Sequence, residues 1–140
     1  MIIYDAENQI LGRISSVIAK KLLKGEMVSV VNCEKAAVAG NRKFTIDKYL
    51  KKFHRGDTIH GPFFPKSPDR IFRRTVRGML PWDRTKGRKA YKNLKVYIGV
   101  PEEFKNKKFE KIEDANADKL KCNYMSLGDI SLQLGVKRRW

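Results

Sequence analysis

The stretch LGRISSVIAKKLLKGEMVSVVN, residues 11–32, decides the fold class, because a helical pattern leads directly into the pattern of a buried strand. Apolar residues recur at helical spacing at Leu11, Ile14, Ile18 and Leu22. Gly25 then follows as a typical helix stop. The nearly continuous run MVSVV is typical of a strand buried on both faces, as in a parallel sheet. Together these patterns predict an α/β fold.

Similar patterns continue on both sides of this stretch. Three further segments have the character of short strands: MIIYDA (1–6), KAAVAG (35–40) and LKVYIGV (94–100). Two segments have helical spacing and end at a glycine: TIDKYLKKFHRG (45–56) and SLGDISLQLG (126–135). We expect Ile46, Leu50 and Phe53 to face inward, and Ser126 to cap the last helix. The alternation predicts one α/β domain, residues 1–140, layered around a central sheet.

The overall charge is strongly positive. The chain carries 31 Lys and Arg against 15 Asp and Glu, which gives a net charge of +16. A chain this basic favours a polyanionic partner: nucleic acid, an acidic protein or an anionic membrane surface. No apolar run approaches the roughly 20 residues that span a bilayer. We therefore expect a soluble protein without a membrane partner.

Side chains typical of catalytic or metal sites are sparse. Cys33 and Cys122 lack metal-ligand spacing and are most simply reduced thiols of a cytosolic protein. His54 and His60 are the only histidines, and neither has a carboxylate or cysteine at ligand spacing. The segment LGRISS lacks the spacing of a phosphate-binding loop. We expect no catalytic residue, no metal, no cofactor and no small-molecule substrate.

The stretch SPDRIFRRTVRGML, residues 67–80, predicts a helix with two different faces. Ser67 is a natural N-cap, and Pro68 suits the first turn. Asp69 lies near the positive end of the helix dipole, and Pro81 ends the helix. One arc holds the cations Arg70, Arg73, Arg74 and Arg77. Another arc holds the apolar residues Phe72, Val76, Met79 and Leu80.

The positive charge is concentrated around this helix. Residues 66–95 hold eleven Lys and Arg against two acids, and so carry +9 of the total +16. Arginine suits phosphate because its planar fork donates two parallel hydrogen bonds. Trp82 and Tyr91 lie among these cations, where they either stack on bases or pack within the fold. The clustering favours a nucleic-acid interface over a solvated face whose arginines pair with acids elsewhere.

Four segments carry a resemblance to a known family: GRISSVIAKKLLKG, VVNCEKAAVAG, RIFRRTVRGMLP and GRKAYKNLKVYIGVP. Residues 2–101 resemble the large-subunit ribosomal protein L-thirteen family, in its archaeal and eukaryotic-type branch. The resemblance implies a three-layer α/β/α fold with a central four-stranded, largely parallel sheet. It also implies a structural, non-catalytic role in the cytoplasmic ribosome, binding large-subunit rRNA beside neighbouring ribosomal proteins and entering assembly early. Trp82 and Asp83 depart from the histidine and lysine that such relatives often have after the proline.

These patterns give an expected layout for the interface. We expect an extended loop at 57–66 anchored by Phe63 and Phe64, a basic helical region at 67–93 and a peripheral C-terminal segment at 102–140. The predicted RNA-binding residues are Arg13, Lys66, Arg70, Arg73, Arg74, Arg77, Arg84, Lys86, Arg88, Lys89, Lys92, Lys137, Arg138 and Arg139. One alternative is a regulator of an mRNA outside the ribosome. Another is an RNA-modifying enzyme, which needs an acid–base constellation that we do not find in the sequence.

Overall fold

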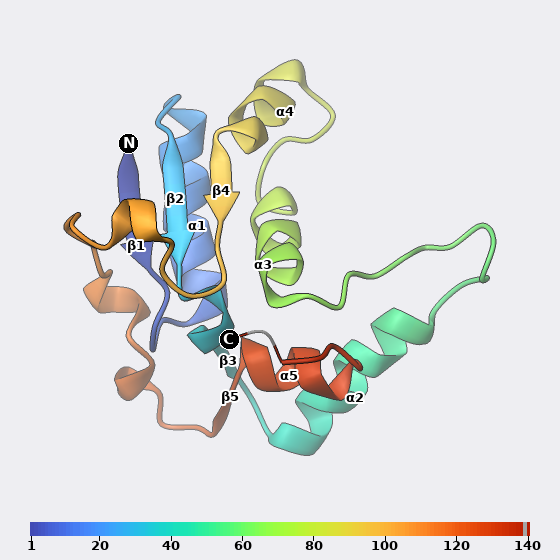
Figure 1. Cartoon of the computed structure of the whole chain (residues 1–140). Helices are drawn as coiled ribbons and strands as arrows, with labels where there is room; N and C mark the ends of the chain where they lie inside the picture. The colour runs from blue at the N-terminus through green and yellow to red at the C-terminus, as the bar shows by residue number, and fades with distance from the viewer. Residues whose placement is uncertain (139) are drawn as a thin grey trace.

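The computed structural model of the chain describes residues 1–138 and Trp140. It confirms the helix and the strand predicted from residues 11–32, as α1 (Leu11–Leu23) and β2 (Val28–Val31). The four apolar residues at helical spacing are all buried on α1, and every residue of β2 is buried. Gly25 lies between them with a φ of 90°, which residues with a side chain rarely adopt (Figure 1). It therefore lets the chain turn back from the helix into the sheet.

Three parallel strands form the central sheet, in the order β1-β2-β4. β1 (Ile2–Asp5) and β4 (Leu94–Val96) flank β2, and Val28 of β2 lies opposite both Ile2 and Leu94. The predicted α/β class and the parallel pairing are confirmed. The central sheet has three strands within the described residues, so the fourth strand that the resemblance implied is not seen there.

The strand predicted at 35–40 belongs to a second, smaller sheet. β3 (Ala37–Ala39) pairs antiparallel with β5 (Tyr124–Ser126). The cause lies just after β2, where Asn32 takes a left-handed φ of 54° and Cys33–Lys35 form a 3-10 turn. The chain has therefore left the central sheet before β3 begins.

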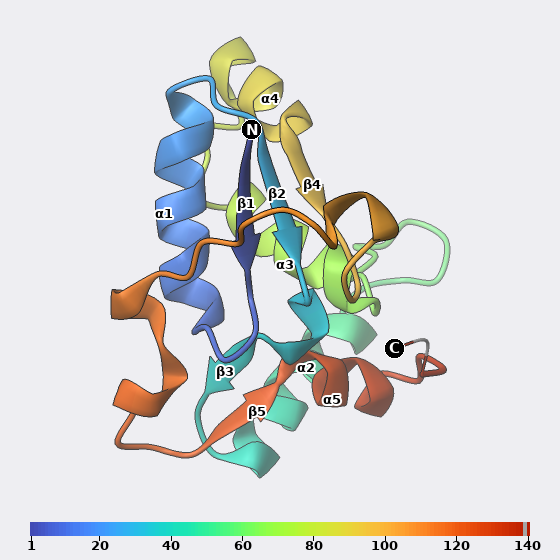
Figure 2. The ribbon, with the colours of Figure 1, turned by 60° about the vertical axis from the view of Figure 1, so that its left-hand side comes forward.

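The two faces of the central sheet are covered differently. Tyr4 and Val30 face the main core, which α1 and α3 (Pro68–Arg77) complete. Ile3 and Val31 face the other way and pack against side chains of the chain that follows β4. That chain crosses in front of the sheet and is irregular apart from one short 3-10 turn (Figure 2). Among the described residues, the second face therefore carries irregular chain where the resemblance implied a helical layer.

The remaining helices lie at the two ends of the sheet. α2 (Arg42–His54) and α5 (Leu127–Gln133) lie with the small sheet at one end, and α4 (Thr85–Lys92) lies at the other (Figure 1). Ser126 caps α5 as predicted, because its hydroxyl accepts a hydrogen bond from the Asp129 amide at 3.1 Å. Short 3-10 turns complete the chain at Glu102–Phe104, Glu113–Ala115 and Ala117–Lys119. None of the described helices combines the length and the apolar character needed to cross a bilayer.

The α2 helix confirms the prediction of a helix at residues 45–56, but with a slightly different rotation. Thr45 and Tyr49 are buried, whereas Ile46, Leu50 and Phe53 are half-buried at the edge of the core. The apolar spacing therefore located the helix correctly and placed its inward face about one residue out of phase.

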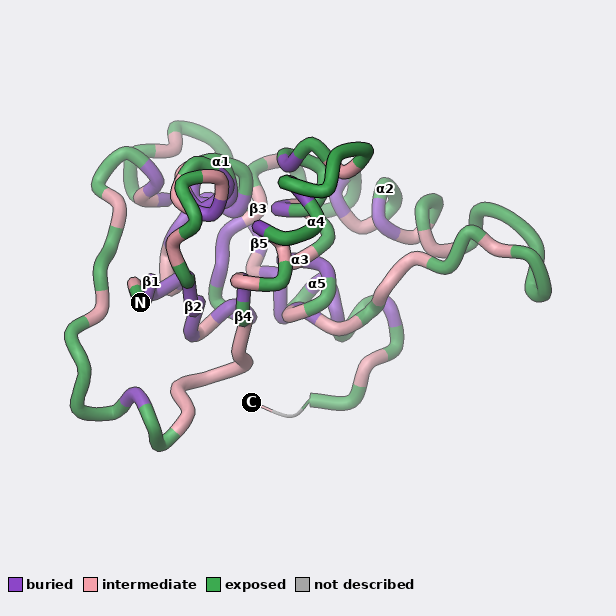
Figure 3. The backbone as a smooth tube through the Cα atoms, turned by 90° about the horizontal axis from the view of Figure 1, so that it is seen from above, coloured by how far each residue is buried: buried purple, intermediate pink, exposed green. Residues whose placement is uncertain are grey.

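A loop projects from the body of the fold between α2 and α3, and most of it is exposed (Figures 1 and 3). The Phe64 ring meets the Tyr49 ring edge-on, with 6.0 Å between centroids. Phe63 is 68% exposed. Successive side chains of an extended chain point in opposite directions, so only one of the pair faces the body. The anchoring role predicted for both residues is therefore confirmed for Phe64 and wrong for Phe63.

Candidate nucleic-acid interface

The α3 helix has a buried side and a cationic side, as predicted. It begins after Ser67, with Pro68 in its first turn, and it buries Ile71, Phe72 and Val76. The helix ends at Arg77, with Gly78 as its C-cap. It is therefore shorter than the sequence predicted, since Pro81 was expected to end it. Because the chain leaves helical geometry after Arg77, the burial predicted for Met79 is wrong: this side chain is 41% exposed, while Leu80 is buried.

The four arginines of the α3 helix share one hollow. Arg70, Arg73, Arg74 and Arg77 line a depression of about 290 Å³ together with Pro65 and Tyr91. We call this depression the arginine hollow. Arg70, Arg74 and Arg77 are exposed, and Arg73 is half-buried. The common arc predicted for the four side chains is therefore confirmed.

No salt bridge within the described residues neutralises these cations. Five salt bridges occur in the described chain, and none of them involves a residue between 66 and 95. The Nε of Arg73 is buried and has no hydrogen-bond partner within the described residues. An unsatisfied buried donor costs about 1–3 kcal/mol. The arginine hollow therefore has the unpaired positive charge expected of an anion-binding site.

Two aromatic rings hold two of the arginines in place. The guanidinium carbon of Arg73 lies 4.9 Å from the ring centroid of Tyr91, and that of Arg77 lies 4.1 Å from the ring centroid of Trp82. The two rings meet edge-on, with 5.3 Å between centroids. Of the two roles considered for Trp82 and Tyr91, packing within the fold is the one observed. The rings restrict the motion of the guanidinium groups that an anion would meet.

The α4 helix is docked against the chain that leaves α3. Gly87 is buried, and a Cβ atom added to it would lie 2.1 Å from the Pro81 carbonyl oxygen, so this contact requires glycine. Arg88 Nε also donates a hydrogen bond to the Trp82 carbonyl oxygen at 3.0 Å. The contacts of α4 therefore help to hold the Trp82 and Tyr91 rings, and the arginines that lie on them, between α3 and α4.

The cations of α4 lie on more than one side of the helix. Lys86 and Lys89 line a second depression, of about 380 Å³, with Lys24 from the end of α1. Arg84 and Lys92 are exposed. The basic region therefore presents at least two separate cationic hollows. Lys24 was not among the predicted RNA-binding residues, because only the fold brings it beside α4.

The other predicted residues lie outside the arginine hollow. Arg13 Nη1 donates a hydrogen bond to the Asp114 carbonyl oxygen at 3.1 Å. Lys66 Nζ lies 4.4 Å from the centroid of the Phe53 ring. Lys137 and Arg138 are exposed beyond α5, and Arg139 lies outside the described residues.

The structure adds α2 to the cationic surface, which the sequence analysis missed. Lys52 Nζ lies 5.8 Å from the Phe64 ring centroid, and the Arg74 guanidinium carbon lies 4.9 Å from the same centroid. Burial lowers the pKa of Lys52, and repulsion from neighbouring cations lowers it further: Lys48, Arg74 and Arg55. The helical spacing of the α2 cations is the signal that could have revealed them.

Comparison with known proteins identifies the family of this chain. The family model "Ribosomal protein L13" matches residues 1–103. Large ribosomal subunit protein uL13 of Archaeoglobus fulgidus is 49% identical over 137 residues, which are 96% of this chain and 88% of the relative. The proteins of the same name from Methanosarcina barkeri and Methanococcoides burtonii are 47% and 45% identical, and each match covers 98% of this chain and 99% of the relative. The basic α/β chain described above therefore belongs to the ribosomal protein L13 family.

Proposed function

We propose that this chain is a structural constituent of the large ribosomal subunit in the cytoplasm, where it binds large-subunit rRNA. The observation that carries the proposal is the arginine hollow, in which four arginines converge without an acidic partner in the described chain. The names of the archaeal relatives, all large ribosomal subunit proteins, support the same role. A structural protein of this kind needs no catalytic group.

The proposed mechanism is the capture of rRNA phosphates by pre-positioned guanidinium groups. Arg73 and Arg77 rest on rings, so they lose less side-chain freedom on binding than free arginines would. The exposed guanidinium groups of Arg70, Arg74 and Arg77 would donate hydrogen bonds to a phosphate oxygen that enters the hollow. Phosphate contacts carry no sequence information directly. Specificity would therefore come from the shape of the folded rRNA against the two helices and the projecting loop.

The proposed interface extends from α3 over the neighbouring elements. It comprises the arginine hollow, the cations of α4 and of the segment before it, Lys66 and the cationic residues after α5. The residues are Lys66, Arg70, Arg73, Arg74, Arg77, Arg84, Lys86, Arg88, Lys89, Lys92, Lys137, Arg138 and Arg139. Arg13, which lies outside the arginine hollow and contacts Asp114, would contact RNA separately. Neighbouring large-subunit proteins are further proposed partners, and we propose that binding occurs early in subunit assembly.

A regulator of an mRNA would use the same surface, so a direct test must separate the two roles. Tagged chain would be expressed in cells, and ribosomal subunits would be washed at high salt and sedimented. We expect the chain to remain with large subunits. A variant with the four α3 arginines changed to alanine should shift toward the light fractions. Recovery of the wild-type chain in light fractions with an mRNA, and not with large subunits, would contradict the proposal.

A further inference from the structure

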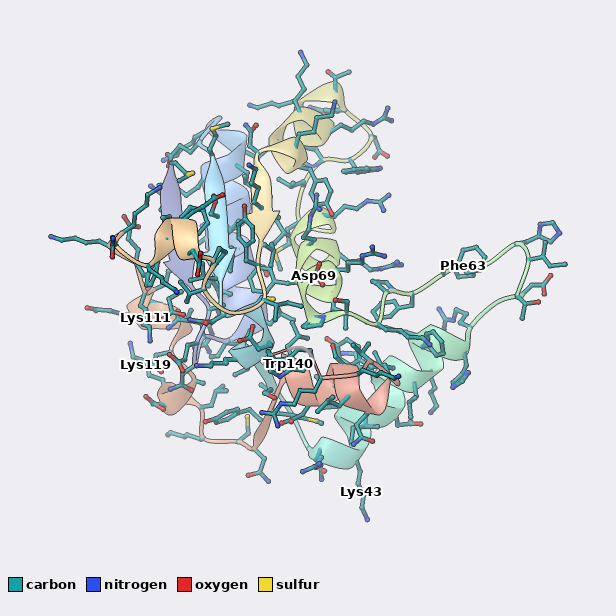
Figure 4. All side chains as sticks on the ribbon, in the orientation of Figure 1. Lys43, Phe63, Asp69, Lys111, Lys119 and Trp140 are labelled. Carbon is teal, nitrogen blue, oxygen red and sulfur yellow. The ribbon has the colours of Figure 1, made fainter. Side chains whose placement is uncertain are left out.

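A second concave site lies between the projecting loop and the end of the chain. It is a groove of about 630 Å³, and its lining includes Phe63, Lys66, Arg70, Ile98, Lys137 and Trp140. We call it the Trp140 groove. Pro65 and Arg70 line both this groove and the arginine hollow, so the two sites adjoin. Figure 4 shows Phe63 out on the projecting loop and Trp140 beside the body of the fold.

The lining of the Trp140 groove combines cations with aromatic side chains. Lys66, Arg70 and Lys137 supply positive charge, and none of the lining residues is acidic. Phe63 is 68% exposed, and Trp140 is half-buried. In the described chain neither ring has an aromatic partner, unlike Trp82 and Tyr91. The groove therefore offers ring surface that the fold leaves unused.

The position of Trp140 is set by α5. A Cβ atom added to Gly128 would lie 3.1 Å from Cζ2 of the indole and 3.2 Å from Cε2, so the ring rests against the backbone at the start of the helix. Arg138 Nε also donates a hydrogen bond to the main-chain oxygen of Trp140 at 3.2 Å. The indole therefore packs against the start of α5 and forms part of the groove wall.

We propose that the Trp140 groove binds unstacked, single-stranded nucleotides of RNA, with one base stacked on the Trp140 indole. Lys66, Arg70 and Lys137 would hold the adjoining phosphates. This inference rests on the proposed function and names a ligand for one part of that interface. Base stacking on aromatic side chains requires bases that are free of a duplex, and cations beside the ring hold the backbone. The adjoining arginine hollow would bind the next phosphates of the same strand.

The test uses the fluorescence of Trp140 in the full chain. Trp82→Phe removes the other tryptophan, so all tryptophan emission comes from the groove. The probes are large-subunit rRNA, a short single-stranded oligonucleotide, the same sequence as a duplex, and heparin as a polyanion without bases. We expect rRNA and the single strand to quench Trp140 strongly, and the duplex and heparin to leave it nearly unchanged. Equal quenching by heparin would contradict base stacking.

Affinity measurements with variants complete the test. Trp140→Ala should weaken binding of the single strand by about 5- to 150-fold, which is the usual range for losing one stacked base. Trp140→Phe keeps a stacking face and should recover most of the affinity. Lys137→Ala should weaken binding more than Lys43→Ala, which removes the same charge from the far end of α2 (Figure 4).

Two outcomes separate the groove from the wider proposal. If rRNA binds strongly while Trp140 emission and the affinity of Trp140→Ala are unchanged, the groove assignment is wrong and the proposed function stands. If rRNA does not bind the wild-type chain, the proposed function itself fails.

Discussion

The guanidinium carbon of Arg77 lies 4.1 Å from the centroid of the Trp82 ring, although Arg77 ends α3 and Trp82 lies in the segment that leads to α4. The Trp82 ring meets the Tyr91 ring of α4 edge-on, and the guanidinium group of Arg73 of α3 lies over the Tyr91 ring. Cations and rings therefore alternate between the two basic helices. This arrangement holds like charges close together without acidic partners, which an isolated helix would not favour.

Arg77 and Trp82 should be energetically coupled. In a double-mutant cycle with Arg77→Ala and Trp82→Ala, we expect a coupling of about 0.5–1 kcal/mol in the free energy of unfolding, which is typical of an exposed cation–π pair. Urea titration of the four proteins measures it. Arg70 provides the matched control, because no cation–π contact to Trp82 involves it in the described chain. Equal coupling in the two cycles would argue against a specific contact.

Gly87 should be far more sensitive to a methyl group than Gly12. A Cβ at Gly87 would lie 2.1 Å from the Pro81 carbonyl oxygen, whereas a Cβ at the exposed Gly12 would have no atom within 4 Å. We expect Gly87→Ala to destabilise the protein and weaken RNA binding, because α4 must move away from Pro81. Gly12→Ala should be neutral or stabilising by up to about 1 kcal/mol. Thermal melts that leave Gly87→Ala as stable as wild type would contradict the docking of α4.

Phe72 should contribute strongly to stability and Met79 weakly. Phe72 is fully buried, and Met79 is 41% exposed just beyond the same helix. We expect Phe72→Ala to lower the free energy of unfolding by about 3–5 kcal/mol. Met79→Ala should change it by no more than about 0.5 kcal/mol. Denaturant titration compares them, and a loss below about 1 kcal/mol for Phe72→Ala would show that the helix is rotated from the position described.

The two cysteines should differ in reactivity. Cys33 is fully buried, and burial, followed by the nearby carboxylates of Glu34 and Asp69, raises the pKa of its thiol well above the usual value. Cys122 is exposed. Because the thiolate is the reactive form, a disulfide reagent at pH 8 should label one thiol quickly in the native protein and both after unfolding. Cys122→Ser should remove the fast phase, and a fast phase that persists in this variant would place Cys33 at the surface.

Local patterns predicted most of the helices and strands correctly. The helix of residues 11–23, the buried strand at 28–31 and the cap at Ser126 depend on residues close together in the chain, and all are confirmed. The partner of β3 was missed because strand pairing depends on contacts between distant segments. Asn32 also takes a left-handed backbone that its residue type alone does not demand.

The arginine stripe was predictable, whereas its surroundings were not. Helical spacing placed the four arginines on one arc, and the structure brings them to one hollow. The helical spacing of the α2 cations indicates a cationic face that includes Lys52, but only tertiary packing brings Lys52 and Lys24 to the cationic surface. The Trp140 groove could not be predicted from the sequence either, because it is formed by a loop, α3 and residues far along the chain.

The most direct test of the central claim is the salt dependence of binding to large-subunit rRNA. Wild type would be compared with Arg70, Arg73, Arg74 and Arg77 changed together to alanine. The control changes four exposed lysines of the C-terminal segment, Lys105, Lys108, Lys119 and Lys121, and so removes the same charge. Circular dichroism should show that all three proteins remain folded.

With about 6–10 phosphate contacts, wild-type affinity should fall by about 10³–10⁵ between 50 and 200 mM salt. The four-arginine variant should lose about 3 to 4 units of the slope of log affinity against log salt, and the lysine control should keep nearly the wild-type slope. Equal slopes in all three proteins would contradict the arginine hollow as the phosphate-binding surface.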